Sequence, residues 1–310
     1  MNTIAKTLMT ALALSMTIAS SAAAEGGSKS PSAQAARADI AKTLGFVPRF
    51  FDDFGDTALP GAWEEMKGLQ MNPNTALPGR TKELVGLAVA SQVPCRYCTY
   101  AHTEFAQLNG ASSAELTEAV ALAGAERHWS AYLYGTQIDM AKYRAELARI
   151  IANAKKPAAN NAAPIAVVDA KTALQDIERT LGFVPEFLRK LPESALPGAW
   201  REMKDLKLSP NTALSPKQKA LISLAVASQV PSEPCIVAET EFAKLAGASE
   251  REIAEAVGMA AITRNMSTML NGDQVDERAF RADIDRLVAG AKAAQKAAQK
   301  KLARRESGTH

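Results

Sequence analysis

The chain has 310 residues, enough for two domains that each bury a core, and 47% of its residues are hydrophobic. With 22% charged residues the composition is that of a globular, alanine-rich and therefore helix-favouring protein, and three cysteines are too few for a disulfide framework. The net charge of +3 comes from the basic C-terminal segment, and the rest of the chain is mildly acidic, which argues against nucleic-acid binding.

The N-terminus has the pattern of a secretory signal peptide. Lys6 provides a positive charge, residues 8–19 form a short apolar run, and the alanines at 22–24 fit a cleavage site before Glu25. The apolar run is too short to span a bilayer, so we expect no stable membrane insertion. We predict that residues 1–24 are removed and that the mature protein is exported, with a bacterial periplasm as its expected location.

After a leader rich in Gly, Ser and Pro, the sequence repeats itself without a gap at a constant offset, residue 43 matching residue 180. The segment TLGFVP at 43–48 recurs at 180–185, ALPGAW at 58–63 recurs at 195–200, and LAVASQVP at 87–94 recurs at 224–231. Such a pattern marks a duplicated domain. We predict a first repeat at 36–154, a linker at 155–164, a second repeat at 165–290 and a basic Ala/Lys tail at 291–310.

The repeats contain residues that typically begin and end helices. Ser112 and Glu115 form a capping box that recurs in the second repeat, and no strand pattern of useful length is present. We therefore predict an all-α fold with about six helices in each repeat, and a solvated basic helix for the tail. Pro94 ends one predicted helix and starts the next, which places Cys95 in the first turn of the second of these helices.

Four chemically active residues gather around that turn. Cys95, Cys98 and His102 stand at positions i, i+3 and i+7, so they share one helix face, and Glu83 on the preceding helix can reach them. A thiol near a helix N-terminus ionises easily, which favours a redox-active dithiol. The alternatives are a structural disulfide and a zinc site, but structural zinc usually draws on two separated ligand pairs, and haem attachment needs a histidine where Thr99 stands. We predict no metal and no cofactor.

The second repeat is an internal control for this site. At the positions of the four site residues it has, in order, Ala220, Ser232, Cys235 and Glu239. A fold that persists without the original groups does not need them for folding, so their role in the first repeat is chemical. We expect the second repeat to be catalytically inactive and Cys235 to be a buried, unreactive thiol.

The spacing Glu-x11-Cys-x2-Cys-x3-His at residues 83–102 resembles the signature of the carboxymuconolactone decarboxylase superfamily, in particular its alkylhydroperoxidase D-like (AhpD-like) branch. Residues of about 36–290 resemble two copies of this domain, and only the first carries the full motif. The resemblance implies an all-helical fold, thiol-dependent peroxidase or disulfide reductase activity, and a homo-oligomer, with a trimer favoured.

The resemblance also implies the roles of the site residues. Cys98 would attack the peroxide, His102 would take its proton while Glu83 orients the ring, and Cys95 would then form the disulfide. Helix electrostatics alone instead favours Cys95 as the thiol of lowest pKa, because it lies closer to the helix N-terminus. Besides the peroxide, such an exported enzyme needs an external dithiol or thioredoxin-like reductant.

Two other functions remain open at this stage. One is a non-catalytic exported helical scaffold with a structural disulfide, and the other is a carboxymuconolactone decarboxylase-like lyase, although that branch does not rely on a Cys-x-x-Cys pair. Four further residues could line a pocket or extend a proton relay near the thiols, or could equally serve as core or subunit contacts: His128, Tyr97, Tyr100 and Trp129.

Overall fold

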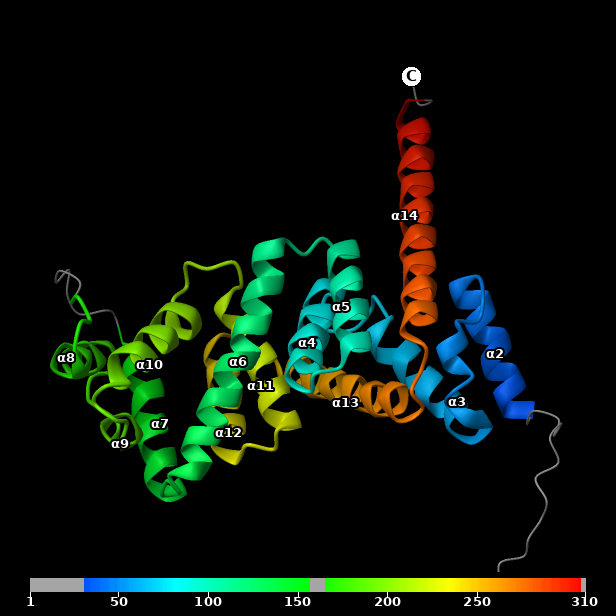
Figure 1. Ribbon diagram of the computed structural model, residues 1–310. Coiled ribbons are helices and arrows are strands. Elements are labelled where there is room, and N and C mark those ends of the chain that lie inside the picture. Colours follow the sequence, from blue (N-terminus) through cyan, green and yellow to red (C-terminus); the bar gives the residue numbers. More distant parts are fainter. Residues whose placement is uncertain (1–30, 157–164, 308–310) are drawn as a thin grey trace, which may run out of the picture.

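The computed structural model describes residues 31–156 and 165–307, and every regular element within these ranges is helical (Figure 1). The all-α prediction is therefore confirmed. The predicted signal peptide lies outside the described residues, as does most of the predicted linker.

The first repeat forms α2 (Pro31–Leu44), η1 (Arg49–Phe51), α3 (Gly55–Glu65), η2 (Met66–Gln70), α4 (Gly79–Gln92), α5 (Arg96–Leu108), α6 (Ser113–Gly135) and α7 (Met140–Ala154). The second repeat forms α8 (Ala170–Leu181), α9 (Glu186–Arg189), α10 (Leu196–Glu202), η3 (Met203–Leu208), α11 (Pro216–Gln229), α12 (Glu233–Leu245), α13 (Glu250–Gly272) and α14 (Glu277–Ser307). The two series follow the same order, as expected for a duplication.

The sequence signals explain where the functionally important helices begin. Ser112 and Ser249 cap the two long helices α6 and α13 through complete capping boxes, as predicted. The turn at Pro94 separates α4 from α5, also as predicted. Cys95, however, is the N-cap of α5 and not a residue of its first turn, because its backbone is extended, with φ −88° and ψ 99°.

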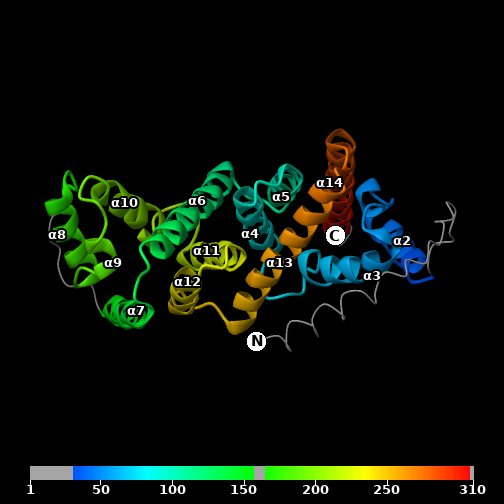
Figure 2. The same ribbon diagram turned by 60° about the horizontal axis from the view of Figure 1, so that its bottom comes forward.

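The last helix of each repeat packs in the part of the molecule built mainly by the other repeat (Figures 1 and 2). Phe280 and Ile284 of α14 share a buried core with Trp63 from the first repeat. At the equivalent positions, Tyr143 and Leu147 of α7 share a core with Trp200 from the second repeat. Full burial of such a side chain contributes about 1.5–3 kcal/mol. Neither core is therefore complete without the other repeat.

Two long helices carry the chain across the molecule and so produce this exchange. The helices α6 and α13 have 23 residues each, a length of roughly 35 Å at the usual rise per residue. Both run through a central core that they share with α4 and α11, and each then enters the opposite half. We call α2 to α5 with α14 the Cys95 half, and α7 to α12 the Cys235 half. The predicted repeats at 36–154 and 165–290 are thus units of sequence, but they are not units of packing.

Buried carboxylates fasten the repeats to each other. Glu255 of α13 accepts hydrogen bonds from the backbone N–H groups of Ala76 and Leu77, at 2.8 and 2.7 Å. Glu118 of α6 accepts the equivalent bonds from Ala213 and Leu214. Charge-assisted bonds to backbone N–H groups are among the stronger ones in proteins, so each repeat holds the loop before the other repeat's central helix.

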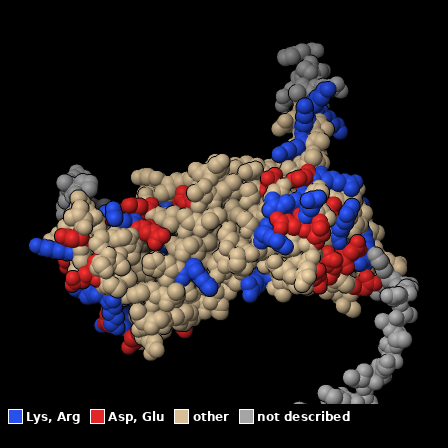
Figure 3. All heavy atoms as spheres, viewed as in Figure 1, with Lys and Arg blue, Asp and Glu red and all other residues tan. Residues whose placement is uncertain are grey.

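The outer part of α14 projects from the body (Figure 1), and Lys and Arg side chains gather along it (Figure 3). The predicted boundary at residue 290 falls inside this helix, which continues without a break into the basic tail. Among the described helices, none combines the length and apolar character needed to cross a bilayer.

Candidate functional site

The dithiol lies at the start of α5, and the helix itself holds the first sulfur. The backbone N–H of Cys98 donates a hydrogen bond to Sγ of Cys95 at 3.2 Å, so the thiol occupies the place of an N-cap oxygen. Both side chains are buried, and all three cysteines of the chain are free thiols. The two thiols of the motif are therefore within one helical turn of each other.

This geometry separates the acidities of the two thiols. A hydrogen bond from the Cys98 thiol, aided by the Cys98 backbone N–H and by Ser267 and Asn271 of α13, lowers the pKa of Cys95 to about 6, although burial opposes the shift. The Nδ2 group of Asn271 lies 3.6 Å from the Cys95 sulfur. The same thiol–thiol bond, together with burial, raises the pKa of Cys98. The geometry thus favours Cys95 as the thiolate, as helix electrostatics predicts, and not Cys98, to which the resemblance gives the attack.

The predicted contact between Glu83 and His102 is formed in the buried space between α4 and α5. Oε2 of Glu83 lies 2.7 Å from Nδ1 of His102, and Gln70 donates a further hydrogen bond to Oε1 of Glu83 at 3.1 Å. The other ring nitrogen of His102 lies 3.3 Å from the hydroxyl of Thr263. Within the described residues the hydrogen bonds of the ring therefore end on Glu83 and Thr263, and the predicted link from imidazole to thiol is absent from this arrangement.

A glycine makes room for the imidazole. A Cβ atom at Gly86 would lie only 2.3–2.6 Å from three atoms of the His102 ring, far inside van der Waals contact. The second repeat has Ser223 at this position and Glu239 in place of the histidine. The His102 ring therefore requires a glycine at position 86. The sequence signal for this residue is its replacement by Ser223 in the second repeat, and it lies outside the Cys-x-x-Cys motif.

The substitution Gly86→Ala should displace the His102 ring and break its contact with Glu83. We expect a loss of about 1–3 kcal/mol in the free energy of unfolding, because the buried ring has to leave its place. Chemical denaturation measures the loss, and imidazole ¹⁵N NMR reports the changed environment of His102. In a His102→Ala background Gly86→Ala should cause no further loss, because no ring is left for the added methyl group to displace.

The matched control is Gly124→Ala in α6, where a Cβ would meet nothing within 4 Å. That change should leave stability unchanged or raise it by up to about 1 kcal/mol. Equal losses in both variants would show that helix propensity, and not the ring, decides the effect.

The other predicted pocket residues divide between the two halves. Tyr97 and Tyr100 lie beside the dithiol. Their hydroxyls donate to the Val275 carbonyl in the turn before α14, at 2.6 Å, and to Asp285 of α14, at 2.5 Å. Trp129, by contrast, lies in the core of the Cys235 half. His128 stacks on Trp129, with Nδ1 3.8 Å from Glu202, and its side chain is 42% exposed. Of the two roles left open for these residues, the structure favours a core contact for Trp129, because α6 carries both residues away from the thiols into the other half.

The motif alone misses the groups that the second repeat and η2 add to the site. Gln70 contacts Glu83, Thr263 contacts His102, and Asn271 contacts Cys95. A signal for the first two was present in the duplication, because their counterparts are the charged residues Lys207 and Glu126. Within residues 31–156 and 165–307, no three His, Cys, Asp or Glu side chains are grouped so as to hold a metal ion.

Fold and site together define an all-α, internally duplicated protein with a dithiol at a helix start and a buried Glu–His pair. The carboxymuconolactone decarboxylase family matches residues 57–138 and 195–278, which is more than half of the chain. The protein belongs to this family, and each match covers one repeat.

The chain is similar in structure to a candidate gamma-carboxymuconolactone decarboxylase subunit from Burkholderia xenovorans LB400, with 16% sequence identity and a TM-score of 0.51. The likeness covers 88% of this chain and 100% of that one, and at this identity it supports the fold alone. No curated protein matches the sequence.

Proposed function

We propose that the protein is a thiol-dependent peroxidase or disulfide oxidoreductase of the AhpD-like type, working through the Cys95–Cys98 dithiol. The observation that carries the proposal is the Cys95 sulfur at the start of α5, where it accepts the backbone N–H of Cys98 and its pKa falls to about 6. At that pKa the thiol is about 90% ionised at pH 7, and the thiolate is the nucleophilic form.

The reaction follows from the two neighbouring thiols. The Cys95 thiolate attacks the outer oxygen of a hydroperoxide, the O–O bond breaks, and the leaving oxygen takes up a proton to give an alcohol, or water from hydrogen peroxide. Cys95 is then a sulfenic acid, with which the Cys98 thiol condenses to a disulfide and a second product, water. An external dithiol returns the pair to two thiols and is itself oxidised to a disulfide.

The Glu83–His102 pair serves this reaction as a positioning unit. It joins α5, which carries both thiols, to α4, and through Thr263 it also joins α13. Asn271 of the same α13 contacts the Cys95 sulfur. A shift of His102 would therefore move the helices that set the acidity of Cys95.

The direct test mixes the reduced protein with hydrogen peroxide or an organic hydroperoxide under anaerobic stopped-flow conditions. We expect two thiols to disappear for each peroxide consumed and a Cys95–Cys98 disulfide in the peptide map. The variant Cys235→Ser is the matched control and should react at the same rate. If peroxide leaves the thiols reduced, the peroxidase proposal fails.

The family also contains decarboxylases, and the same variants separate that function from ours. A lyase of this fold would not need a dithiol. If Cys95→Ser still releases carbon dioxide from carboxymuconolactone, the lyase function is favoured. If the wild type releases none, the oxidoreductase function is favoured.

Export would decide the source of electrons. We propose that the mature protein acts outside the cytoplasm and is reduced there by a thioredoxin-like protein. Mass spectrometry of the mature N-terminus tests the export, because a protein that retains Met1 has not been processed.

A further inference from the structure

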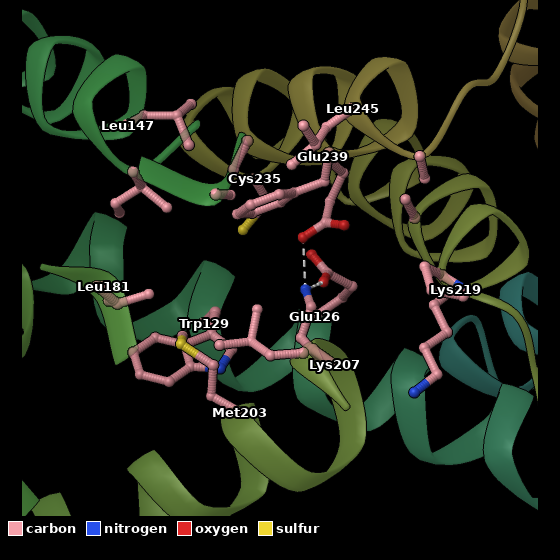
Figure 4. A pocket seen from close by; sticks show the side chains of 18 of the residues that line it. Glu126, Trp129, Leu147, Leu181, Met203, Lys207, Lys219, Cys235, Glu239 and Leu245 are labelled. Carbon is pink, nitrogen blue, oxygen red and sulfur yellow. Dashed lines mark hydrogen bonds and ion pairs between the residues drawn. The ribbon is translucent and has the colours of Figure 1, made fainter. Parts of the chain in front are cut away.

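The Cys235 half contains a cavity of about 420 Å³ (Figure 4). Its volume lies in the usual range for small-molecule sites. Most of its walls are apolar side chains, drawn from α6, α7 and the second repeat; they include Leu133, Leu147, Leu181, Phe187, Met203 and Phe242. The second repeat thus lacks the catalytic motif, but its half of the molecule contains a cavity of the size that a small ligand needs.

A cluster of buried charges lies at one side of this cavity (Figure 4). The ammonium group of Lys207 contacts the carboxylates of Glu126 and Glu239, the latter at 2.5 Å. Both carboxylates are at least 95% buried. Burying charged groups costs desolvation free energy, so stability alone does not explain this cluster.

These residues occupy the positions of the Glu83–His102 site in the other half. By the repeat offset, Lys207 stands for Gln70, Glu239 for His102 and Glu126 for Thr263. The remaining position has Ala220 where the first repeat has Glu83, and Ala220 lines the cavity. Replacement of a glutamate by alanine removes four heavy atoms, which accounts for part of the open space.

The charge state of the cluster limits the kind of ligand. Burial, together with Glu126, raises the pKa of Glu239 to about 8 although Lys207 opposes the shift. With one ammonium group and two carboxyl groups, the cluster carries no net positive charge at pH 7. A ligand anion would face Glu126, and the other lysine that lines the cavity, Lys219, is already bonded to Glu118 and to the backbone carbonyls of Leu206 and Ser209. Burial also raises the pKa of Cys235 to about 12, which leaves its thiol as an uncharged part of the wall.

Two polar atoms of residues that line the cavity are buried without a hydrogen-bond partner. They are the acceptor Oε2 of Glu126 and the donor Nε1 of Trp129. The two residues are three apart on α6 and so lie on one face of that helix. A buried polar atom without a partner costs about 1–3 kcal/mol, which a ligand of matching chemistry would recover.

We propose that the cavity of the Cys235 half binds a neutral, mainly apolar molecule with one hydroxyl group. The hydroxyl oxygen accepts a hydrogen bond from Nε1 of Trp129, and the hydroxyl hydrogen is donated to Oε2 of Glu126. The apolar part of the ligand lies against the leucine and phenylalanine side chains of the cavity wall. The site is separate from the dithiol and does not depend on its chemistry.

Three matched compounds test the proposal by titration calorimetry with the reduced full-length protein at pH 7. They are 4-butylphenol, butylbenzene, which lacks the hydroxyl, and 4-butylbenzoate, which replaces it by an anion. We expect 4-butylphenol to bind at least about ten-fold more tightly than either of the others, which is the effect of one buried hydrogen bond. Equal affinities for the phenol and butylbenzene, tighter binding of the benzoate, or no binding at all would overturn it.

Two variants locate the binding. Trp129→Phe keeps the aromatic wall but removes the donor, so 4-butylphenol should fall to the affinity of butylbenzene, whose own affinity should stay unchanged. Ala220→Met fills the space without adding charge and should weaken the phenol by at least about ten-fold. Thermal unfolding shows whether each variant is folded. Undiminished phenol binding in folded Ala220→Met would place the site elsewhere and end the proposal.

Discussion

In the Cys98→Ser variant, one equivalent of peroxide should leave a stable sulfenic acid on Cys95, while Cys95→Ser should react at least about 100-fold more slowly. The reason is the thiolate fraction at pH 7, which is high for Cys95 with its pKa near 6 and low for Cys98, because burial still raises the pKa of Cys98 after Cys95 is replaced. In Cys98→Ser the serine hydroxyl and the backbone N–H can still donate to the Cys95 sulfur, so the activation of Cys95 persists.

Trapping with dimedone followed by peptide mass spectrometry measures both variants. The adduct is expected on Cys95 in Cys98→Ser, and Cys235→Ser supplies the background, because its dithiol is intact and closes to a disulfide. An adduct that forms only in Cys95→Ser would return the attack to Cys98. His102 would then have to leave Thr263 and reach the thiol during the reaction.

The elements of this site that sequence could predict are those encoded by local spacing. The two thiols, His102 and the turn at Pro94 fall within nine residues, where helix geometry alone relates them. Glu83 lies on the neighbouring helix across a short turn, so its contact with His102 was also within reach of the sequence. Capping boxes and the repeat offset similarly determine the helices.

The exchange of α7 and α14 could not be predicted in the same way. Tyr143 and Phe280 occupy equivalent positions, and so do Trp63 and Trp200, so a terminal helix that packs on its own repeat presents the same apolar pattern as one that packs on the other. The contacts of Thr263 with His102 and of Asn271 with Cys95 come from α13, the helix that leads into α14. Duplication therefore reveals the fold but leaves the partner of each terminal helix undetermined.

The same exchange brings Glu126 of the first repeat to Lys207 and Glu239 of the second. The substitution Lys207→Met should lower the free energy of unfolding by about 3–5 kcal/mol at pH 8, because it leaves two buried carboxylates without a cation. Burial opposes the charged form of Lys207, but the two carboxylates outweigh it and raise the pKa of the ammonium group, so the wild type keeps the cation throughout this pH range.

The free energy of unfolding of Lys207→Met should depend strongly on pH. Without Lys207 to oppose it, burial should raise the pKa of Glu239 in the folded protein still further above its value in the unfolded chain. A carboxyl group whose pKa is raised by folding contributes stability that is fully present below about pH 4 and is lost as the pH rises. The variant should therefore be close to the wild type at pH 5 and much weaker at pH 8, as measured by urea unfolding at both values.

The first repeat supplies the control, because Gln70 is the counterpart of Lys207 and carries no charge. Gln70→Met removes the hydrogen bonds of the Gln70 amide to the two Glu83 oxygens, at 3.1 and 3.4 Å, and should cost about 1 kcal/mol. A loss in Lys207→Met that is as small as this at pH 8, or that does not change between pH 5 and pH 8, would mean that water reaches the two carboxylates. In that case the charges would not be buried, and the cavity beside them would be open to solvent.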